Sequence, residues 1–573
     1  MYKGTSASAG IGIGKAVIVE EAELVITRQT VSSAEAEIQR FKGALDQTIA
    51  ATERLAEDLA ARVGEKEAEI MQGHMMLLSD PMLTGEIENS IKNENVNSEF
   101  AIENVCNMYA DMFASMGDEL MQQRATDMRD IKTRMQQMLM GIQSVDISSL
   151  PAGSIIVAKD LTPSMTAGIN PANVTGIVTE LGGKTSHSAI LARALEIPAV
   201  VAITGLMGAL KDGDDVILDG STGDVYVNPD EAVKAEYDDK RKQFLIEKKE
   251  LEQYIGKPSV TKDGVQVEIV ANIGKPEDVD KVLQYDGEGI GLFRTEFLFM
   301  DRSAMPTEEE QFEAYRKVAV AMKGKPVIIR TLDIGGDKEI PYMGLEKDEN
   351  PFLGYRAIRF CLDRKEDVYK PQLRALLRAS AFGNIRIMVP LVTCIEEYRE
   401  AKALVEELKK ELDGQGIAYN KDIQVGIMVE TAAASLIADI FAKEVDFFSI
   451  GTNDLTQYTM SVDRGNKKVS YLYSTFNPAV LRSIRHIIAC GREAGIMVGM
   501  CGEAASDPLM IPLLLAFGLN EFSMSASAIL KARKMVTEYS TKELCAVADQ
   551  AMSYATAAEI EQYMRDFVEK VTV

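Results

Sequence analysis

The sequence predicts a multidomain α/β protein, in which a small α/β domain with an inserted helical bundle is followed by a linker helix and a C-terminal (β/α)8 TIM barrel. Three observations lead to this fold class. The chain has 573 residues, too many for a single hydrophobic core. Short β-like runs separated by glycine and aspartate turns follow residue 150. Beyond residue 260, apolar strand-like runs alternate with helical segments down to the C-terminus.

The α/β domain is predicted to comprise residues 1–20 and 146–229, with helices at 21–145 inserted after its first strand, 15–19. Ser32-Ser33-Ala34-Glu35 has the form of a capping box, which marks a helix start. Apolar residues at helical spacing follow it, namely Ile38, Phe41, Leu45, Ile49, Leu55 and Leu59. The later strands of the domain are expected at 154–158, 174–178, 199–202, 215–218 and 225–227.

Residues 230–258 are predicted to form the linker helix, since they are charged and helix-favouring until Gly256-Lys257-Pro258. The barrel is then assigned to 259–573. Its strands are expected as continuous apolar runs, because parallel strands are buried on both faces. The eight runs are 265–273, 289–293, 327–330, 385–389, 425–429, 446–450, 496–500 and 521–524.

Composition excludes several classes of function. The formal net charge of -25 disfavours nucleic acid and anionic membranes as partners. The six cysteines are scattered without CxxC pairs, which argues against disulfides or zinc and fits a reducing compartment. The start of the chain does not resemble a signal peptide, and its apolar stretches are too short to span a bilayer. A cytoplasmic protein without membrane insertion is therefore expected.

Polar residues stand at or just beyond the ends of the predicted barrel strands. They are Asn272, Arg294, Arg330, Glu430, Asn453, Asp454 and Cys501. The carboxyl ends of barrel strands converge on one face, where active sites lie. A purely structural barrel would not need charged groups on so many strand ends. The sequence therefore predicts an active site at this face.

Arginines near these strand ends are candidate anion binders. Guanidinium groups offer fixed pairs of donors that suit phosphate and carboxylate. The candidates are Arg294, Arg330, Arg356 and Arg464. Together they would suit a small, multiply charged anion, whereas any one of them alone could equally form a surface salt bridge.

Glu430 and Asp454 end strands that are neighbours in the chain order. Two carboxylates completed by substrate oxygens and water suit Mg²⁺, which rarely has an all-protein cage. The alternative is a carboxylate pair held by neighbouring arginines. The position of Cys501 beside those arginines would favour ionisation of its thiol and predicts an acid/base role, although an inert buried thiol is the alternative.

His187 is one of only three histidines, with His74 and His486. It follows Gly182-Gly183, and Thr185 and Ser186 are candidate helix caps before it. A helix N-terminus disfavours imidazolium and favours an added anion. Both effects suit a neutral imidazole that attacks phosphorus and then carries phosphate. A satisfied core histidine is the alternative, and the polar, glycine-rich flanks count against it.

Two long runs of the chain resemble the signature segments of the PEP-utilising enzyme family, where PEP is phosphoenolpyruvate. They are residues 182–193, Gly-Gly-Lys-Thr-Ser-His-Ser-Ala-Ile-Leu-Ala-Arg, and residues 446–457, Asp-Phe-Phe-Ser-Ile-Gly-Thr-Asn-Asp-Leu-Thr-Gln. The resemblance extends over essentially the whole chain. It implies that His187 takes the phosphoryl group of PEP, with Thr166 as its hydrogen-bond partner.

The resemblance also implies roles for the other residues. Arg294, Arg330, Arg356, Arg464, Asn453 and Lys338 would hold PEP, and Glu430 with Asp454 would bind Mg²⁺. Cys501 would protonate the enolate to give pyruvate. The helical insert would dock the phosphocarrier protein HPr through Gly73, His74, Met76, Leu77 and Arg124. Relatives in the family are homodimers through the barrel, and the reaction is the first step of sugar uptake by phosphotransfer.

Two other functions remain open at this stage. A dikinase or synthase that makes PEP from pyruvate and ATP shares the two runs, but it needs an ATP-binding domain, for which there is no room before residue 150. A non-catalytic regulatory homologue would be expected to lose the arginines, the carboxylates or His187, and all of them are present.

Overall fold

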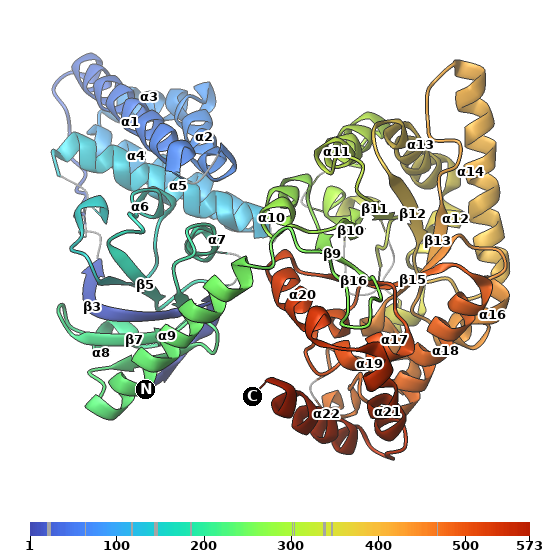
Figure 1. The fold of residues 1–573 in the computed structure, drawn as a ribbon. Coiled ribbons are helices and arrows are strands. Elements are labelled where there is room, and N and C mark those ends of the chain that lie inside the picture. Colours follow the sequence, from blue (N-terminus) through green and yellow to red (C-terminus); the bar gives the residue numbers. More distant parts are fainter. Residues whose placement is uncertain are drawn as a thin grey trace. The chain divides into compact units, whose positions relative to one another are not determined.

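The computed structural model describes residues 1–19, 24–62, 65–115, 119–142, 147–183, 186–300, 302, 304–335, 340–344, 348–466 and 468–572. The chain divides into two compact units, Met1–Lys248 and Lys249–Val573 (Figure 1). The first unit contains a helical insert and an α/β domain, and the second is a barrel.

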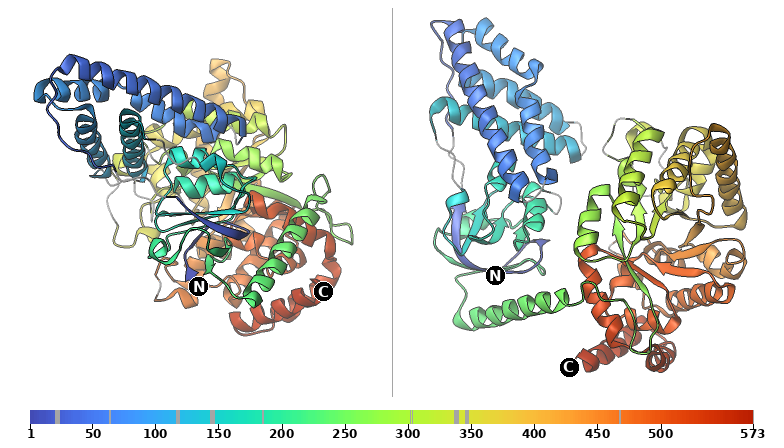
Figure 2. Two further views of the ribbon diagram at one scale, coloured as in Figure 1. Left: turned by 90° about the vertical axis from the view of Figure 1, so that its left-hand side faces the viewer. Right: turned by 45° about the horizontal axis from the view of Figure 1, so that its top comes forward.

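The helical insert consists of long helices around an apolar core. Its helices are α1 (Ala34–Arg62), α2 (Glu65–Leu78), α3 (Pro81–Glu94), α4 (Ser98–Ser115) and α5 (Glu119–Met140). Figure 2 shows the long helix α1 running beside other helices of the insert. The cap of α1 differs by one residue from the predicted one, because Ser33 rather than Ser32 accepts the hydrogen bond from the Ala36 N–H at 3.2 Å.

The α/β domain is built on one eight-stranded sheet in the order β1-β8-β7-β3-β4-β5-β6-β2. Its strands are β1 (Tyr2–Lys3), β2 (Thr5–Ser8), β3 (Ile11–Val19), β4 (Ser154–Ala158), β5 (Val174–Thr179), β6 (Ala199–Val201), β7 (Asp215–Asp219) and β8 (Asp224–Val227). The insert lies between β3 and β4, which pair in parallel. It therefore follows the third strand, not the first, because two short strands at the edges of the sheet precede β3.

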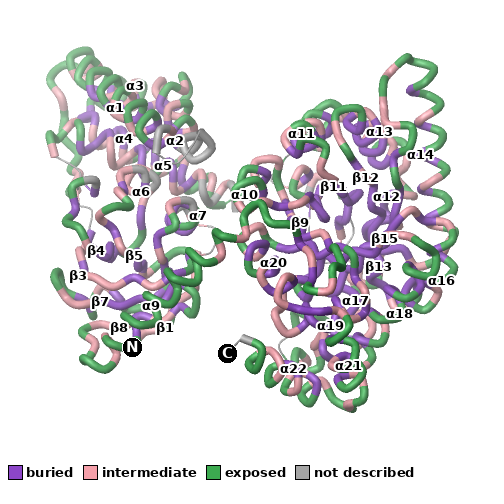
Figure 3. Tube along the Cα trace, in the orientation of Figure 1, coloured by how far each residue is buried: buried purple, intermediate pink, exposed green. Residues whose placement is uncertain are grey.

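Three short helices complete the α/β domain, namely α6 (Pro163–Ala167), α7 (His187–Ala194) and α8 (Leu206–Ala209). The predicted linker helix is α9 (Glu231–Glu252), and the boundary between the two units falls inside it. Most of its residues are exposed (Figure 3). Tyr237 is the exception, since it is buried against the ring of Tyr226.

The second unit contains a closed barrel of eight parallel strands, as predicted. They are β9 (Glu268–Ile273), β10 (Ile290–Arg294), β11 (Val327–Arg330), β12 (Ile385–Val389), β13 (Val425–Val429), β14 (Phe447–Ile450), β15 (Met497–Met500) and β16 (Glu521–Met524). Apolar side chains fill the barrel interior, including Leu292, Ile328, Met388 and Phe447. A packed interior leaves the strand ends as the place for chemistry.

Helices surround this barrel and share one large apolar core with the outer faces of its strands (Figures 1 and 3). They are α10 (Val279–Gln284), α11 (Glu308–Ala321), α12 (Ile358–Asp363), α13 (Lys370–Ala379), α14 (Ile395–Gln415), α15 (Ala432–Leu436), α16 (Ala438–Phe441), α17 (Thr452–Met460), α18 (Pro478–Ala494), α19 (Ile511–Phe517), α20 (Ile529–Glu538), α21 (Thr541–Ala551) and α22 (Ala557–Thr572). Among the helices described, none combines the length and the apolar character needed to cross a membrane.

Candidate active site

Two of the predicted arginines occupy neighbouring strand ends at the barrel mouth. Arg294 is the last residue of β10 and Arg330 the last residue of β11, and the two are partners in the strand register. The Nε atom of each is buried and donates no hydrogen bond within the described part of the chain. Both therefore keep an unused donor inside the site.

Buried carboxylates hold the Arg330 guanidinium in place. Nη2 donates to Oε1 of Glu296 at 2.6 Å, and Nη1 lies 2.9 Å from Oδ2 of Asp333. Burial by itself lowers the pKa of Arg330, but the charges of Glu296, Asp333 and Glu430 more than offset burial and raise this pKa. The guanidinium is therefore permanently charged and fixed in one orientation.

Arg356, in the turn before α12, joins the same cluster. Its Nη2 lies 2.9 Å from Oδ1 of Asp333 and 3.3 Å from Oδ2 of Asp454. Its Nη1 donates to the Tyr458 hydroxyl at 3.3 Å. Asp333 therefore bridges Arg330 and Arg356, and the Nε atom of Arg356 is a third buried donor without a hydrogen bond among the described residues.

Glu430 follows β13, and Asp454 lies in the first turn of α17 after β14. The Leu391 N–H donates to Oε1 of Glu430 at 2.6 Å. Burial raises the pKa of Glu430 to about 8, and the nearby carboxylates of Asp454 and Asp333 add to the effect. Oδ1 of Asp454 is buried and accepts no hydrogen bond from any described residue, although Nη1 of Arg464 lies 3.6 Å away.

Glu430 and Asp454 suit a divalent cation that takes only some of its ligands from the protein. No group of three or more metal-type side chains occurs among the residues that the structure describes. The protein thus offers two carboxylates, one of them with an unused oxygen, and Mg²⁺ commonly takes its other ligands from substrate and water. A cation would also relieve the repulsion that raises the pKa of Glu430.

Cys501 follows β15 and is buried, with its N–H donating to the Ile450 carbonyl at 3.1 Å. Burial raises the pKa of its thiol to about 11, and the charge of Arg330 offsets only part of that increase. The charge of Arg330 favours ionisation of this thiol, as expected, but desolvation of the thiolate outweighs that attraction. The thiol remains protonated at neutral pH.

The other predicted PEP ligands are more open. The side chain of Arg464 is 34% exposed. Asn453 is half-buried, and its Oδ1 accepts a long hydrogen bond of 3.5 Å from the Glu503 N–H. Lys338 lies outside the described residues. Asn272 has a structural task, since its Nδ2 donates to the carbonyl of Cys501 at 3.0 Å.

Glycine is required at two strand ends of this mouth. A Cβ atom on Gly451 would lie 2.7 Å from Oε2 of Glu430, and one on Gly502 would lie 1.8 Å from Oγ1 of Thr452. Real Cβ atoms do not approach other atoms so closely. The backbone at these points is therefore packed directly against the side chains of Glu430 and Thr452.

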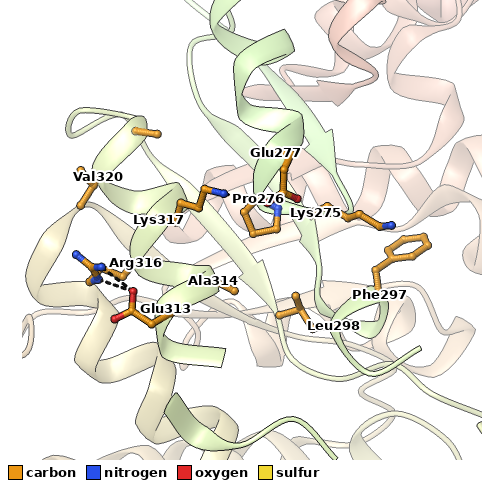
Figure 4. Close-up of a pocket in the computed structure, with 11 residues that line it drawn as sticks. Lys275, Pro276, Glu277, Phe297, Leu298, Glu313, Ala314, Arg316, Lys317 and Val320 are labelled. Atoms are coloured by element: carbon orange, nitrogen blue, oxygen red, sulfur yellow. Dashed lines mark hydrogen bonds and ion pairs between the residues drawn. The ribbon is translucent and has the colours of Figure 1, made fainter. Parts of the chain in front are cut away.

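A cavity on the barrel unit lies elsewhere. It has a volume of about 640 Å³ and opens between the loop after β9 and helix α11 (Figure 4). Lys275, Phe297 and Lys317 are among the residues that line it. None of the predicted site residues contributes to its lining, so it is separate from the candidate active site.

In the first unit, His187 is the first residue of α7. Ser186 caps this helix by accepting from the Ala189 N–H at 3.4 Å. Gly182 has φ of 101°, a backbone region that favours glycine. The side chain of His187 and the whole of Thr185 lie outside the described residues. Thr166 is buried in α6, a helix that contacts α7.

The predicted HPr-binding residues lie close together on α2 and α5. Met76 is 74% exposed, and Gly73 lies against Arg124, whose Nη1 would be 3.2 Å from an added Cβ. Leu77 is half-buried. His74 is fully buried, with Nε2 3.3 Å from Oδ1 of Asp127. Its side chain therefore supports this surface from within instead of forming part of it.

Sequence reasoning missed the acidic partners of the arginines. Glu296 and Asp333 were assigned no role, although both follow a strand end within three residues of an arginine. That spacing was the available signal. The spacing does not show that both carboxylates are buried. A buried carboxylate needs a cation beside it, which is why each of these two lies against an arginine.

Comparisons with known proteins agree with these observations. Three family models match the chain: "PEP-utilising enzyme, N-terminal" over residues 3–124, "PEP-utilising enzyme, mobile domain" over 150–223, and "PEP-utilising enzyme, PEP-binding domain" over 248–541. The phosphoenolpyruvate-protein phosphotransferase of Staphylococcus carnosus (strain TM300) is 48% identical, covering 99% of this chain and 98% of that protein. The protein of the same name from Bacillus subtilis (strain 168) is 47% identical, covering 98% and 99%. An NMR solution structure of Enzyme I (nEIt) is 41% identical over 43% of this chain and 99% of that one, with a TM-score of 0.39.

Proposed function

Because this chain belongs to the PEP-utilising enzyme family, we propose that it is a phosphotransferase that moves the phosphoryl group of PEP to its own His187 and then to HPr, releasing pyruvate. Near full-length identity of 47–48% to two phosphoenolpyruvate-protein phosphotransferases supports this activity. The reaction would be the first step of the sugar phosphotransferase system. A soluble cytoplasmic homodimer, paired through the barrel, is the form we expect.

The barrel mouth would bind PEP through its arginines. PEP carries a carboxylate and a phosphate, and guanidinium groups match both. The buried Nε donors of Arg294, Arg330 and Arg356 have no hydrogen-bond partner in the described structure. Asp333 fixes the orientation of the Arg330 and Arg356 guanidinium groups. Arg464, Asn453 and Lys338 would complete the contacts from the more open side.

Glu430 and Asp454 would hold Mg²⁺ beside the phosphoryl group. The ion would supply positive charge against the charge that develops during phosphoryl transfer. The unused Oδ1 of Asp454 and the raised pKa of Glu430 support this assignment.

In the transfer itself, a neutral His187 nitrogen would attack phosphorus as the bond from phosphorus to the bridging oxygen of PEP breaks. The electron pair of that bond would pass to the enolate of pyruvate. The enolate carbon would then take the proton of the Cys501 thiol, leaving a thiolate that regains a proton from solvent. A thiol with a pKa of about 11 is protonated before each turnover, as a proton donor must be.

His187 belongs to the first unit and the barrel mouth to the second. His187 would take the phosphoryl group at the barrel mouth and then pass it to HPr on the helical insert. Its imidazole must therefore face a different partner in each of the two steps. We expect the linker helix α9 to permit this exchange, as a hinge does in other enzymes with moving domains. HPr would dock on Met76 and Leu77, with Gly73, His74 and Arg124 close by.

The observation that carries the proposal is the set of buried guanidinium donors gathered around two carboxylates at strand ends. Its test is incubation of the protein with Mg²⁺ and PEP labelled in the phosphoryl group. We expect acid-labile label on the wild type and on His486→Ala, a control at an exposed histidine of α18, and none on His187→Ala. Added HPr should remove the label. Acid-stable label, or equal label on His187→Ala, would contradict the proposal.

A further inference from the structure

A buried carboxylate joins the helical insert to the α/β domain. Asp130, on α5, is 2% exposed. Its Oδ2 accepts from the Ser164 N–H at 3.0 Å, and its Oδ1 accepts from the Ser164 hydroxyl at 2.7 Å. Ser164 lies in the first turn of α6. One side chain of the insert therefore holds this short helix by two hydrogen bonds.

Two further side chains of the insert, those of His74 and Arg134, act on the same carboxylate. Nδ1 of His74 lies 3.7 Å from Oδ2 of Asp130. Arg134, one turn further along α5, is half-buried, and its Nη2 donates to Oγ1 of Thr52 at 2.8 Å. Burial lowers the pKa of Arg134, and the charge of Asp130 works against that decrease. These contacts place Asp130 between a docking helix, α2, and the short helix α6.

The elements held in this way belong to the phosphoryl-carrying site. Thr166 is two residues beyond Ser164 in the same helix, and α6 contacts α7, which begins at His187. Leu191 of α7 also packs against Leu59 and Met71 of the insert. The insert therefore contacts both helices that carry the proposed phosphoryl chemistry, one by polar and one by apolar groups.

We propose that Asp130 is a positioning residue for phosphoryl transfer, which fixes α6 and so keeps Thr166 in place on the helix that contacts α7, the helix that begins at His187. This inference rests on the proposed function. A carboxylate accepting two hydrogen bonds restrains both the backbone and the side chain of Ser164, and hydrogen bonds to an ionised acceptor are stronger than neutral ones. Small displacements of groups that orient a reacting atom are costly, at about 100-fold in rate for 1 Å.

The test separates the rate of transfer from the binding of HPr. Single-turnover transfer from the labelled protein to HPr and the Kd for HPr would be measured for wild type, Asp130→Asn, Ser164→Ala and the double variant. We expect each single variant to transfer about 10- to 100-fold more slowly with an unchanged Kd. The double variant should be no slower than Asp130→Asn alone, because the hydroxyl bond that Ser164→Ala removes is one of the two bonds to the carboxylate that Asp130→Asn already alters.

Asp111→Asn, at an exposed aspartate of α4, is the matched control and should behave as wild type. Ser164→Ala decides the question alone if Asp130→Asn does not fold, since it keeps the charge of Asp130. Wild-type transfer rates in the variants would overturn the inference, and so would a weaker Kd with an unchanged rate, because Asp130 would then serve the docking surface. A wild type that takes no label from PEP would overturn the proposed function as well, which separates the two failures.

Discussion

Glu521 leads to a measurable dependence of stability on pH. It is the first residue of β16 and is fully buried in the barrel. Neither of its carboxyl oxygens has a hydrogen-bond partner within the described chain. Burial raises its pKa to about 8, the charge of Glu268 adds to the increase, and Arg386 offsets part of it. The carboxyl is therefore mainly protonated in the folded protein at pH 7.

The sign of the effect follows from proton binding. An unfolded chain releases this proton near the ordinary pKa of 4.5, whereas the folded chain keeps it up to about 8. Between these values the folded state binds one more proton, so the free energy of unfolding falls as pH rises. The decrease is about 1.4 kcal/mol per pH unit, which amounts to about 2–3 kcal/mol between pH 5 and pH 7.

Glu521→Gln tests this reasoning, because glutamine has the shape of the protonated carboxyl and cannot ionise. Relative to wild type, the variant should gain about 1.4 kcal/mol per unit as pH rises from 5 to 7. Urea unfolding at several pH values, followed by far-UV circular dichroism, measures the difference. Glu543→Gln, at an exposed site on α21, is the control. Parallel pH profiles for wild type and Glu521→Gln would refute the argument.

Three further predictions concern the proposed site. Cys501→Ser should lower kcat about 100-fold or more while KM for PEP changes little. In the wild type, the rate at which Cys501 is alkylated should keep rising beyond pH 9, because the pKa of its thiol is about 11. An alkylation rate that levels off near pH 9 would contradict this reasoning. Arg330→Lys should raise KM for PEP and destabilise the barrel by about 1–3 kcal/mol, the cost of leaving a buried acceptor without its donor. One ammonium cannot replace the contacts of Arg330 to both Glu296 and Asp333. Steady-state kinetics and calorimetry check the two parts, and an unchanged KM would contradict the first. Met76→Asp should weaken HPr binding without slowing labelling of the protein by PEP, and titration with HPr would reveal an unchanged Kd if this surface is not the docking site.

The barrel was predictable because its strands are buried on both faces. Such strands appear in a sequence as continuous apolar runs, and the runs at 327–330, 385–389, 425–429 and 521–524 coincide with β11, β12, β13 and β16. The edge strands β1 and β2 were not predictable. They have two and four residues and pair with β8 and β6 from the other end of the domain, so no local pattern marks them.

At the site, the sequence predicted which positions meet but not their electrostatic state. Strand-end placement was enough to bring Arg330, Glu430 and Asp454 together. For Cys501 the sequence indicates the attraction of the arginines but not the desolvation that outweighs it, because desolvation depends on how completely the thiol is buried. Burial also separates His74 from Met76, although the two are only two residues apart on α2. Both differences come from tertiary packing, which a sequence pattern does not record.

The two glycines at the barrel mouth have a consequence for how this protein can change over generations. At most surface positions, substitution by alanine or serine changes the stability of a protein little. At Gly451 and Gly502 even a methyl group would collide with Glu430 or Thr452. Gly502 is the stricter of the two positions, because the backbone nitrogen of Thr452 would also lie 2.7 Å from an added Cβ, whereas at Gly451 the nearest atom is the movable carboxylate end of Glu430. An alanine at position 502 in a distant homologue would therefore indicate that the backbone of its barrel mouth has changed.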